Sequence, residues 1–214
     1  MAADEFLLWT YTDAPYKTAK DLVEAMRTKG AGFKMGGGHS KDTDHILTRQ
    51  VEKAIGASVT FVPFKSGGEV AVQLAGKHID SNTNNPNENV SHWKAGKVRP
   101  LCVFAEKRLS GYAEKIVGDQ SFADVPTCKE EGIPITQFSM PRTIWLPGKT
   151  TDEQVKYYVD VMNKVREKPE WKEWLRTGLQ TESFITGEKL NAYIKEDEQK
   201  HKQHFADDKW LVVE

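Results

Sequence analysis

VTFVPFKSGGEVAVQLA, residues 59–75, places a strand pattern directly before a helix pattern. The residues up to Phe64 are rich in β-branched and aromatic side chains, which favours a strand. Ser66 and Glu69 then form an S-x-x-E capping box, typical of a helix start, and the helix is expected to reach Ala75. A strand that leads into a helix is the repeating unit of α/β sheets.

The same alternation covers residues 6–104. Strands are expected at 6–11, 78–83 and 98–104, helices at 18–30, 46–55 and 85–96, and a loop at the glycine-rich run 36–40. Thr18 with Asp21, and Asn85 with Pro86, mark two of the helix starts. This order of elements predicts an α/β fold with a mainly parallel sheet flanked by helices.

Beyond residue 104 the alternation ends. We expect an irregular surface stretch at 107–124, a short helix at 126–131 and an extended passage at 133–146. Helices are then predicted at 151–167, 169–177 and 186–205, the first opened by a capping box of Thr150 with Glu153. The pattern therefore predicts an internal boundary at about 135–147, with the C-terminal helices packing as a separate unit.

Composition and charge exclude several classes of protein. The 214 residues are 38% hydrophobic and 29% charged, with a net charge of −1, which is ordinary for a globular protein and argues against nucleic acid as a partner. No apolar run approaches the roughly 20 residues that span a bilayer. The stretch 1–8 carries two acids and no basic region, so we do not interpret it as a signal peptide.

Cys102 and Cys128 are the only cysteines. Two cysteines cannot form a closed zinc site, and the apolar run around Cys102 predicts that this residue is buried. A disulfide between them is the less favoured alternative and would require an oxidising compartment.

Three strand-to-helix junctions, at 36–44, 65–69 and 84–88, place small or polar residues at helix starts. Unpaired backbone N–H groups and the positive end of the helix dipole favour anions there, at the carboxyl edge of the sheet. The alternative interpretation is that these residues only cap their helices. The glycine run lacks the spacing of phosphate-binding and dinucleotide-binding loops.

No catalytic constellation emerges. Ser66 does not lie in a G-x-S-x-G elbow, and neither cysteine has the context of a nucleophile. His201 and His204 are three residues apart, but neighbouring lysines favour a solvated helix face over a metal site. We therefore expect no cofactor, no metal and no enzymatic activity.

Several stretches, taken in order, resemble the Bug family, the solute receptors of tripartite tricarboxylate transporters. They are DAPYKT at 13–18, GGGHSKDTDHI at 36–46, VPFKSGGE at 62–69, GKHID at 76–80, HWKAGKVRPL at 92–101, DVPT at 124–127 and WLPG at 145–148. KRL at 107–109 and EEG at 130–132 also keep the family order. The resemblance covers about residues 13–148.

The resemblance implies a two-lobed type II periplasmic-binding-protein fold that closes on a small mono- or dicarboxylate and serves membrane transporter subunits. It implies residues 1–11 as a first hinge strand, 12–135 as lobe two, and 136–214 as the return hinge with the C-terminal helices of lobe one. The N-terminal half of lobe one has no counterpart in the sequence. By family resemblance the location is periplasmic.

The residues expected to bind the carboxylate are Gly37, Gly38, His39, Ser40, Thr43, Ser66, Gly67, Asn85 and, on the return strand, Arg142. Lys41 and Asp42 depart from the family, and an acid in this loop would repel a carboxylate. The alternative function is a truncated or partner-dependent binding or sensor module. Absence of the first half of lobe one should leave an apolar patch, covered in a homo-oligomer or exposed, at Trp171, Trp174, Tyr193 and Phe205.

Overall fold

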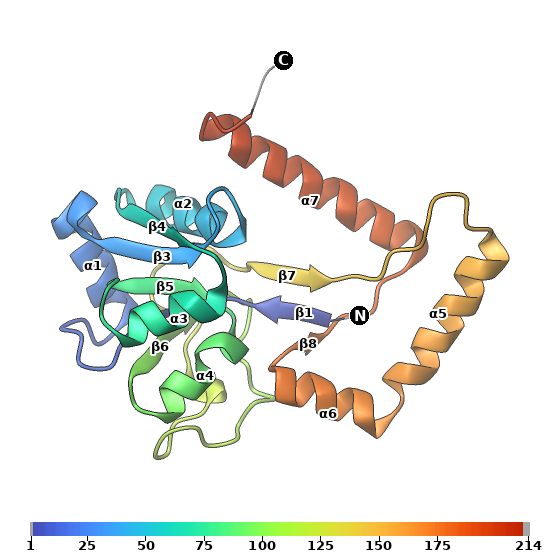
Figure 1. Ribbon diagram of the computed structural model, residues 1–214, viewed down its shortest axis with the longest axis horizontal. Helices are drawn as coiled ribbons and strands as arrows, with labels where there is room; N and C mark the ends of the chain where they lie inside the picture. Colours follow the sequence, from blue (N-terminus) through green and yellow to red (C-terminus); the bar gives the residue numbers. More distant parts are fainter. Residues whose placement is uncertain (1, 212–214) are drawn as a thin grey trace. The chain divides into compact units, whose positions relative to one another are not determined.

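A computed structural model describes residues 2–211 (Figure 1). The chain forms two units. Of the described residues, the first comprises 4–140, and the second comprises 141–211 together with 2–3. The predicted division into a hinge strand (1–11), lobe two (12–135) and the C-terminal part of lobe one (136–214) remains a prediction.

A five-stranded sheet is the centre of the unit 4–140 (Figure 1). Its order is β4-β3-β5-β2-β6, formed by β4 (Thr60–Phe64), β3 (Lys34–Gly38), β5 (Ser81–Asn84), β2 (Leu7–Tyr11) and β6 (Val98–Val103). Strand β3 is parallel to β4 and β5, whereas β2 is antiparallel to β5 and β6. The α/β class is confirmed, but the sheet is mixed, because β2 runs against its neighbours.

Four helices follow the strands of this sheet. They are α1 (Ala19–Lys29), α2 (Thr43–Ile55), α3 (Gly67–Ala75) and α4 (Pro86–Lys94). Thr18 caps α1 in the predicted capping box with Asp21, and the Ser66 hydroxyl caps α3 by accepting from the Glu69 amide. The local sequence signals therefore place these helix starts correctly.

Alternation along β2 builds a core on both faces of the sheet. Leu8 joins the apolar faces of α1 and α2 in one cluster, which also contains Phe33. Trp9 belongs to an aromatic cluster with Trp93 of α4 and Phe122, with ring centroids 4.9–6.1 Å apart. Phe122 lies in the short helix η2 (Phe122–Asp124).

Cys102 of β6 forms a disulfide with Cys128, and both residues are fully buried. The sequence favoured separate cysteines, so the less favoured alternative is the correct one. The bond attaches the outermost strand β6 to the turn that follows residue 126. In addition, the Val103 amide donates to Pro126 and the Cys128 amide donates to Val103, both within 2.9 Å.

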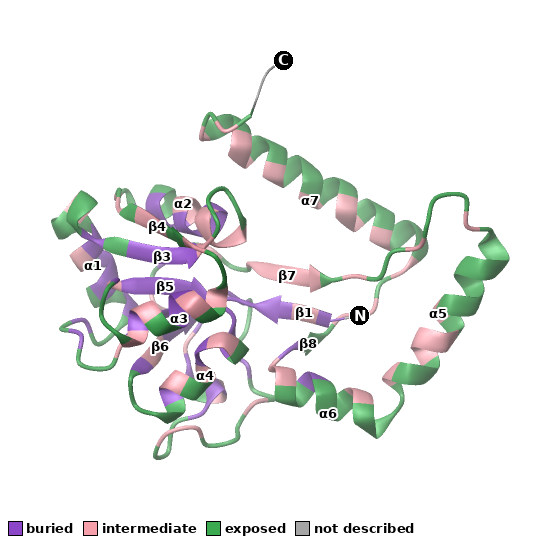
Figure 2. Cartoon of the chain, viewed as in Figure 1, coloured by how far each residue is buried: buried purple, intermediate pink, exposed green. Residues whose placement is uncertain are grey.

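The second unit contains few buried residues (Figure 2). A three-stranded sheet has the order β7-β1-β8. Strand β8 (Thr181–Glu182) belongs to this unit, whereas β7 (Ser139–Arg142) and β1 (Ala2–Glu5) each include residues of both units. Its helices are α5 (Asp152–Arg166), α6 (Pro169–Gly178) and α7 (Gly187–Asp207). Helices α5 and α7 bury no residue, and α6 buries only Leu175.

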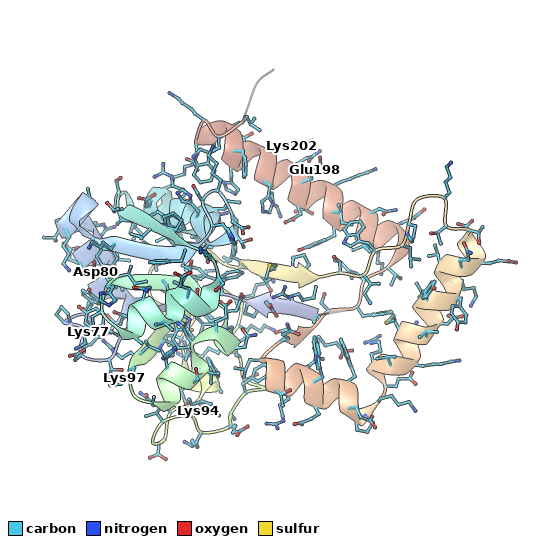
Figure 3. The ribbon with its side chains drawn as sticks, in the orientation of Figure 1. Lys77, Asp80, Lys94, Lys97, Glu198 and Lys202 are labelled. Atoms are coloured by element: carbon cyan, nitrogen blue, oxygen red, sulfur yellow. A yellow bond between two sulfur atoms is a disulfide. The ribbon has the colours of Figure 1, made fainter. Side chains whose placement is uncertain are left out.

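The long helix α7 buries no residue and carries ion pairs along its own surface. Ion pairs one turn apart join Lys200 to Glu196 and Lys202 to Glu198, each at 2.6 Å. Figure 3 labels Lys202 and Glu198. Exposed pairs of this kind contribute only a few tenths of a kcal/mol each, about 0.3–0.5. Among the described residues, no helix is both long and apolar enough to cross a bilayer.

Three further sequence predictions, all local, are wrong in this structure. The glycine run 36–38, expected as a loop, is the end of the central strand β3. Residues 126–131, expected as a helix, form a turn. The α5 capping box uses Thr151 with Gln154 instead of Thr150 with Glu153, one residue further along.

Candidate functional site

The three predicted junctions meet at one edge of the sheet. Strands β4, β3 and β5 are parallel, so their last residues, Phe64, Gly38 and Asn84, lie at the same end. The His39 amide donates to the Phe64 carbonyl at 2.8 Å, and the Asn84 side-chain amide donates to the Gly67 carbonyl at 2.8 Å. These two bonds join the first junction to the second, and the second to the third.

Glycine at two of these positions allows carboxylate side chains to approach the backbone. A Cβ at Gly37 would lie 2.5 Å from the Cβ of Asp44 and 2.8 Å from the Phe61 ring. A Cβ at Gly67 would collide with the carboxylate of Glu88. The missing side chains therefore make room for Asp44 and Glu88 at the centre of the three junctions.

The Asp44 carboxylate accepts a hydrogen bond of 2.5 Å from the Gly38 amide. Burial raises the pKa of Asp44 to about 7, an effect that the Gly38 hydrogen bond opposes and the charges of Glu88 and Asp42 reinforce. Near neutral pH this side chain is therefore divided between a carboxylate and a carboxylic acid. In the acid form it can donate a hydrogen bond to another carboxylate.

Most amides expected to hold the ligand already have acceptors within the chain. The Lys41 amide donates to His45 Nδ1 at 3.0 Å, and the Thr43 amide donates to Asp42 at 2.8 Å. His39 and Lys41 have positive φ angles of 35° and 63°, a backbone conformation that residues other than glycine rarely adopt. The loop thus folds back on itself and satisfies its own donors.

The remaining predicted residues are distributed as follows. Ser66 is exposed and uses its hydroxyl oxygen in the α3 cap, while the Thr43 hydroxyl donates to Asp42 at 3.2 Å. Asn85 is buried, and its side-chain amide donates to the Glu5 carbonyl at 3.0 Å. Arg142 belongs to the second unit. The ligand-binding roles of all nine residues remain predictions.

A strip of buried amides lies behind the junctions. Asn84 donates to Asn89 at 3.0 Å, and Asn89 donates to Asn82 at 3.2 Å; all three residues are fully buried. Within residues 2–211, the Asn84 Oδ1 and Asn82 Nδ2 atoms have no protein hydrogen-bond partner. Unpaired polar atoms of this kind are costly in a protein interior unless water or a ligand reaches them.

No group of three or more potential metal-ligating side chains occurs among the described residues. The model of the tripartite tricarboxylate transporter family receptor matches residues 1–207. The chain belongs to this receptor family.

Solved structures share the fold of this chain. A TctC solute-binding protein from Polaromonas is 24% identical with a TM-score of 0.75, and alignment covers 96% of this chain and 67% of that one. A Rhodopseudomonas palustris protein solved with adipate is 19% identical with a TM-score of 0.83, covering 96% and 66%. Malate is bound in another protein of that organism, 16% identical with a TM-score of 0.67, covering 84% and 58%.

A curated relative from Agrobacterium vitis, the UPF0065 protein in the TAR-I ttuE-ttuC' intergenic region, is 25% identical over 138 residues. That alignment covers 64% of this chain and 37% of the relative. The chain thus spans about two thirds of the length of the first solved structures and a smaller share of the curated relative.

The predicted junctions 36–44 and 84–88 include Asp44, Asn84 and Glu88, but the sequence assigned these three residues no role of their own. Glu88 occupies the third helical position of α4, where an acid normally indicates a cap, so its contact with Gly67 was not foreseen. Gly67 itself was a signal, however. A glycine at the first position of a helix can mark a place where another group approaches the backbone closely.

Proposed function

We propose that this chain is the ligand-recognising part of an extracytoplasmic receptor for a small mono- or dicarboxylate, working with membrane subunits of a tripartite transporter and catalysing no reaction. The family match over residues 1–207 supports the class of function. The single structural observation that carries the site is the meeting of three strand-to-helix junctions at one sheet edge. The disulfide supports an oxidising, periplasmic compartment.

The proposed site lies at residues 36–45, 65–69 and 84–88. Helix starts contribute partial positive charge there, and the hydroxyls of Ser40 and Ser66 can fix the orientation of an oxyanion. The Thr43 hydroxyl can do so only by exchanging its hydrogen bond to Asp42 for one to the ligand. Asp44 stands in the same place, so we propose that the ligand carboxylate shares a proton with its acid form. Binding should then be stronger on the acid side of the Asp44 pKa, which is about 7.

Titration calorimetry with adipate and malate tests this proposal. We expect affinity to rise about tenfold from about pH 8 to about pH 5.5, as Asp44 takes up its proton. Asp44→Asn, which donates without titrating, should remove most of the pH dependence, whereas Asp119→Asn, at an exposed position, should keep it. In an NMR titration with the same ligands, amide chemical-shift changes that fall outside the three junctions would reject the site. A pH dependence of affinity in D44N that follows that of the unmodified chain would reject the role of Asp44.

A second candidate is the partner-dependent module, favoured by the scarcity of buried residues in α5, α6 and α7. Trp174 is 50% exposed, and Trp171, Tyr193 and Phe205 are partly buried. Self-association through these aromatic residues remains a prediction, which sedimentation velocity at rising protein concentration checks. Absence of ligand binding at about 10 mM carboxylate, with an intact fold, would favour this candidate over a self-sufficient receptor.

A further inference from the structure

The end of the five-stranded sheet away from the three junctions is basic. Strands β3, β5 and β6 start at this end and β2 ends there, because β2 runs antiparallel to both of its neighbours. Four connecting turns, at 12–17, 29–34, 76–80 and 94–97, therefore meet at this end. They carry two acids, Asp13 and Asp80, and six lysines, namely Lys17, Lys29, Lys34, Lys77, Lys94 and Lys97. In Figure 3, Lys77, Asp80, Lys94 and Lys97 lie along this side of the unit.

Hydrogen bonds join the four turns into one surface. The Thr12 amide donates to the Lys97 carbonyl at 3.0 Å, which joins the turn after β2 to the turn before β6. The Lys34 amide donates to the Asp80 carboxylate at 2.8 Å, and the Tyr16 hydroxyl donates to the same carboxylate at 2.9 Å. The lysines of the four turns are therefore held on neighbouring pieces of backbone.

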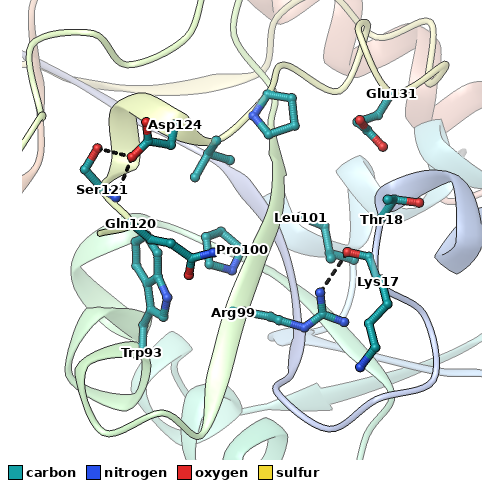
Figure 4. Close-up of a pocket in the computed structure, with 12 residues that line it drawn as sticks. Lys17, Thr18, Trp93, Arg99, Pro100, Leu101, Gln120, Ser121, Asp124 and Glu131 are labelled. Atoms are coloured by element: carbon teal, nitrogen blue, oxygen red, sulfur yellow. Dashed lines mark hydrogen bonds between the residues drawn. The ribbon is translucent and has the colours of Figure 1, made fainter. Parts of the chain in front are cut away.

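Lys17 is fixed at this end by two further hydrogen bonds. Its ammonium group donates to the Ala14 carbonyl at 3.1 Å, and its own carbonyl accepts from Arg99 Nη1 at 2.7 Å (Figure 4). Arg99 is partly buried in β6 and adds a positive charge behind the turn, which Asp21 partly offsets.

The two acids leave most of the lysines without an ion pair. Asp80 pairs with Lys29 at 2.9 Å, and Asp13 pairs with Lys77. Across residues 2–211, no ion pair involves the remaining lysines, all of which are exposed: Lys17, Lys34, Lys94 and Lys97. The basic end therefore carries an excess of positive charge that the fold does not neutralise.

Helix capping explains only part of this excess. Lys29 and Lys94 lie in the last turns of α1 and α4, where cations stabilise the helix dipole. Lys34 and Lys97 lie beyond those helices, at or directly before the first residue of a strand. Within the described part of the chain, neither of these two ammonium groups makes a hydrogen bond or an ion pair. Their charges are available to a partner.

The opposite end of the same sheet is acidic. The three junctions carry two lysines, Lys41 and Lys65, against four acids, Asp42, Asp44, Glu69 and Glu88. A body with one basic and one acidic end turns its basic end toward a negatively charged surface. The junctions would then face away from that surface and stay open to solution.

The composition of the basic end favours lipid headgroups over a folded protein as the negative partner. Protein interfaces are enriched in aromatic residues and arginine and depleted in lysine. The charged excess here consists of lysines, and none of the described residues in the four turns is an exposed large hydrophobic one. Lysine carries a compact charge on a flexible stem, which can follow phosphate groups that have no fixed arrangement.

We propose that the four turns form a docking surface for anionic phospholipid headgroups, which holds the chain on a membrane while the junctions remain accessible to ligand. Each unpaired lysine at such a surface contributes about fivefold to the affinity. Salt weakens this attraction, since the Debye length is about 8 Å at 0.15 M salt. Docking needs no carboxylate, so this proposal and the proposed ligand site can fail independently.

Co-sedimentation of the whole chain with vesicles tests the docking surface. Vesicles of phosphatidylcholine with about 40 mol% phosphatidylglycerol are compared with pure phosphatidylcholine vesicles at about 0.03 M and about 0.3 M salt. We expect binding to the anionic vesicles at the lower salt, at least about tenfold weaker binding at the higher salt, and no measurable binding to the neutral vesicles. Saturating adipate should leave the binding unchanged.

Two double substitutions of equal charge locate the surface. Lys94→Gln with Lys97→Gln should weaken vesicle binding about 25-fold, because each lysine contributes about fivefold. Lys107→Gln with Lys129→Gln removes the same charge at exposed positions outside the four turns and should weaken it less than about threefold. Circular dichroism checks that both variants fold.

Four results would overturn the lipid proposal. The first is no binding to the anionic vesicles at the lower salt, and the second is equal binding to the neutral vesicles. The third is an equal loss of binding in the two double variants. The fourth is tighter binding to poly-L-glutamate than to vesicles at the same concentration of negative charge, which would assign the basic end to an acidic protein.

Discussion

The unit 4–140 and the C-terminal helices use the same helix signals but differ in what their apolar faces contact. In the first, Leu22, Leu47 and Phe33 are fully buried in a continuous core. In the second, Tyr157 of α5 is 64% exposed and Trp174 of α6 is 50% exposed. Amphipathic helices are stabilised mainly by packing of their apolar faces. Substitutions in the core of the first unit should therefore lower the free energy of unfolding strongly, whereas substitutions of exposed residues in the C-terminal helices should hardly change it.

The largest expected effect is truncation of the core. Phe33→Ala should lower the free energy of unfolding by about 3–5 kcal/mol, because it leaves a cavity between α1, α2 and the sheet. Tyr157→Ala is the matched control in the C-terminal helices and should change it by less than about 0.5 kcal/mol. Urea unfolding followed by circular dichroism measures both. A Tyr157 effect as large as the Phe33 effect would show that α5 is covered in solution.

The disulfide gives the second effect. Replacing Cys102 and Cys128 together by alanine should cost about 3 kcal/mol, because the bond closes a loop with a sequence separation of 26 and so restricts the unfolded chain. Reduction of the unmodified chain should lower its stability in the same direction, while the double variant should not respond to the reductant. A double variant as stable as the oxidised chain would contradict this account.

Asp44 gives a smaller, pH-dependent effect. Its pKa of about 7 lies above the value of about 3.9 in an unfolded chain. Between these values the folded state binds more protons, so this group makes stability fall as pH rises from about 4 to about 7. Asp44→Asn keeps an acceptor for the Gly38 amide but carries no charge. It should be more stable than the unmodified chain by about 2 kcal/mol at about pH 8 and similar at about pH 4.

Thermal unfolding across this pH range measures the Asp44 effect, with Asp119→Asn as the exposed control. Parallel pH curves for Asp44→Asn and the unmodified chain would mean that Asp44 is solvated like the control. The same outcome would weaken the proposed proton sharing with a ligand carboxylate.

Local signals explain which elements the sequence predicted well. The starts of α1 and α3 depend on hydrogen bonds between residues three apart, and their capping boxes are visible in the sequence. Strand β6 was found from its continuous apolar run. The α5 cap was misplaced by one residue, because two adjacent threonines precede it and only the fold selects between them.

Tertiary contacts explain what the sequence could not predict. Three consecutive glycines disfavour a strand, yet residues 36–38 form one because β4 pairs along β3 and β5 pairs with its other side. The approach of Glu88 to Gly67 joins residues 21 positions apart and leaves no local pattern. The disulfide likewise depends on the path of the chain after β6, so the residues around Cys102 and Cys128 could not predict that the two cysteines meet.

The smallest expected effect compares two capping boxes of the same design. Thr18 accepts from the Asp21 amide at 3.1 Å, and Thr151 accepts from the Gln154 amide at 3.3 Å. Thr18→Ala should lower global stability by about 1 kcal/mol, because fraying α1 disturbs a helix whose apolar face is in the core. Thr151→Ala should lower it by no more than about 0.5 kcal/mol, since α5 can fray with little loss of burial.

Hydrogen exchange separates the two cases more finely than a global measurement. Faster exchange confined to the first turn of α5 in Thr151→Ala would show a helix that opens locally, independent of the core. Equal global costs for the two substitutions would instead mean that α5 unfolds together with the core. Because both caps are built from the same interactions, any difference between them reports only on how strongly each helix is coupled to the rest of the chain.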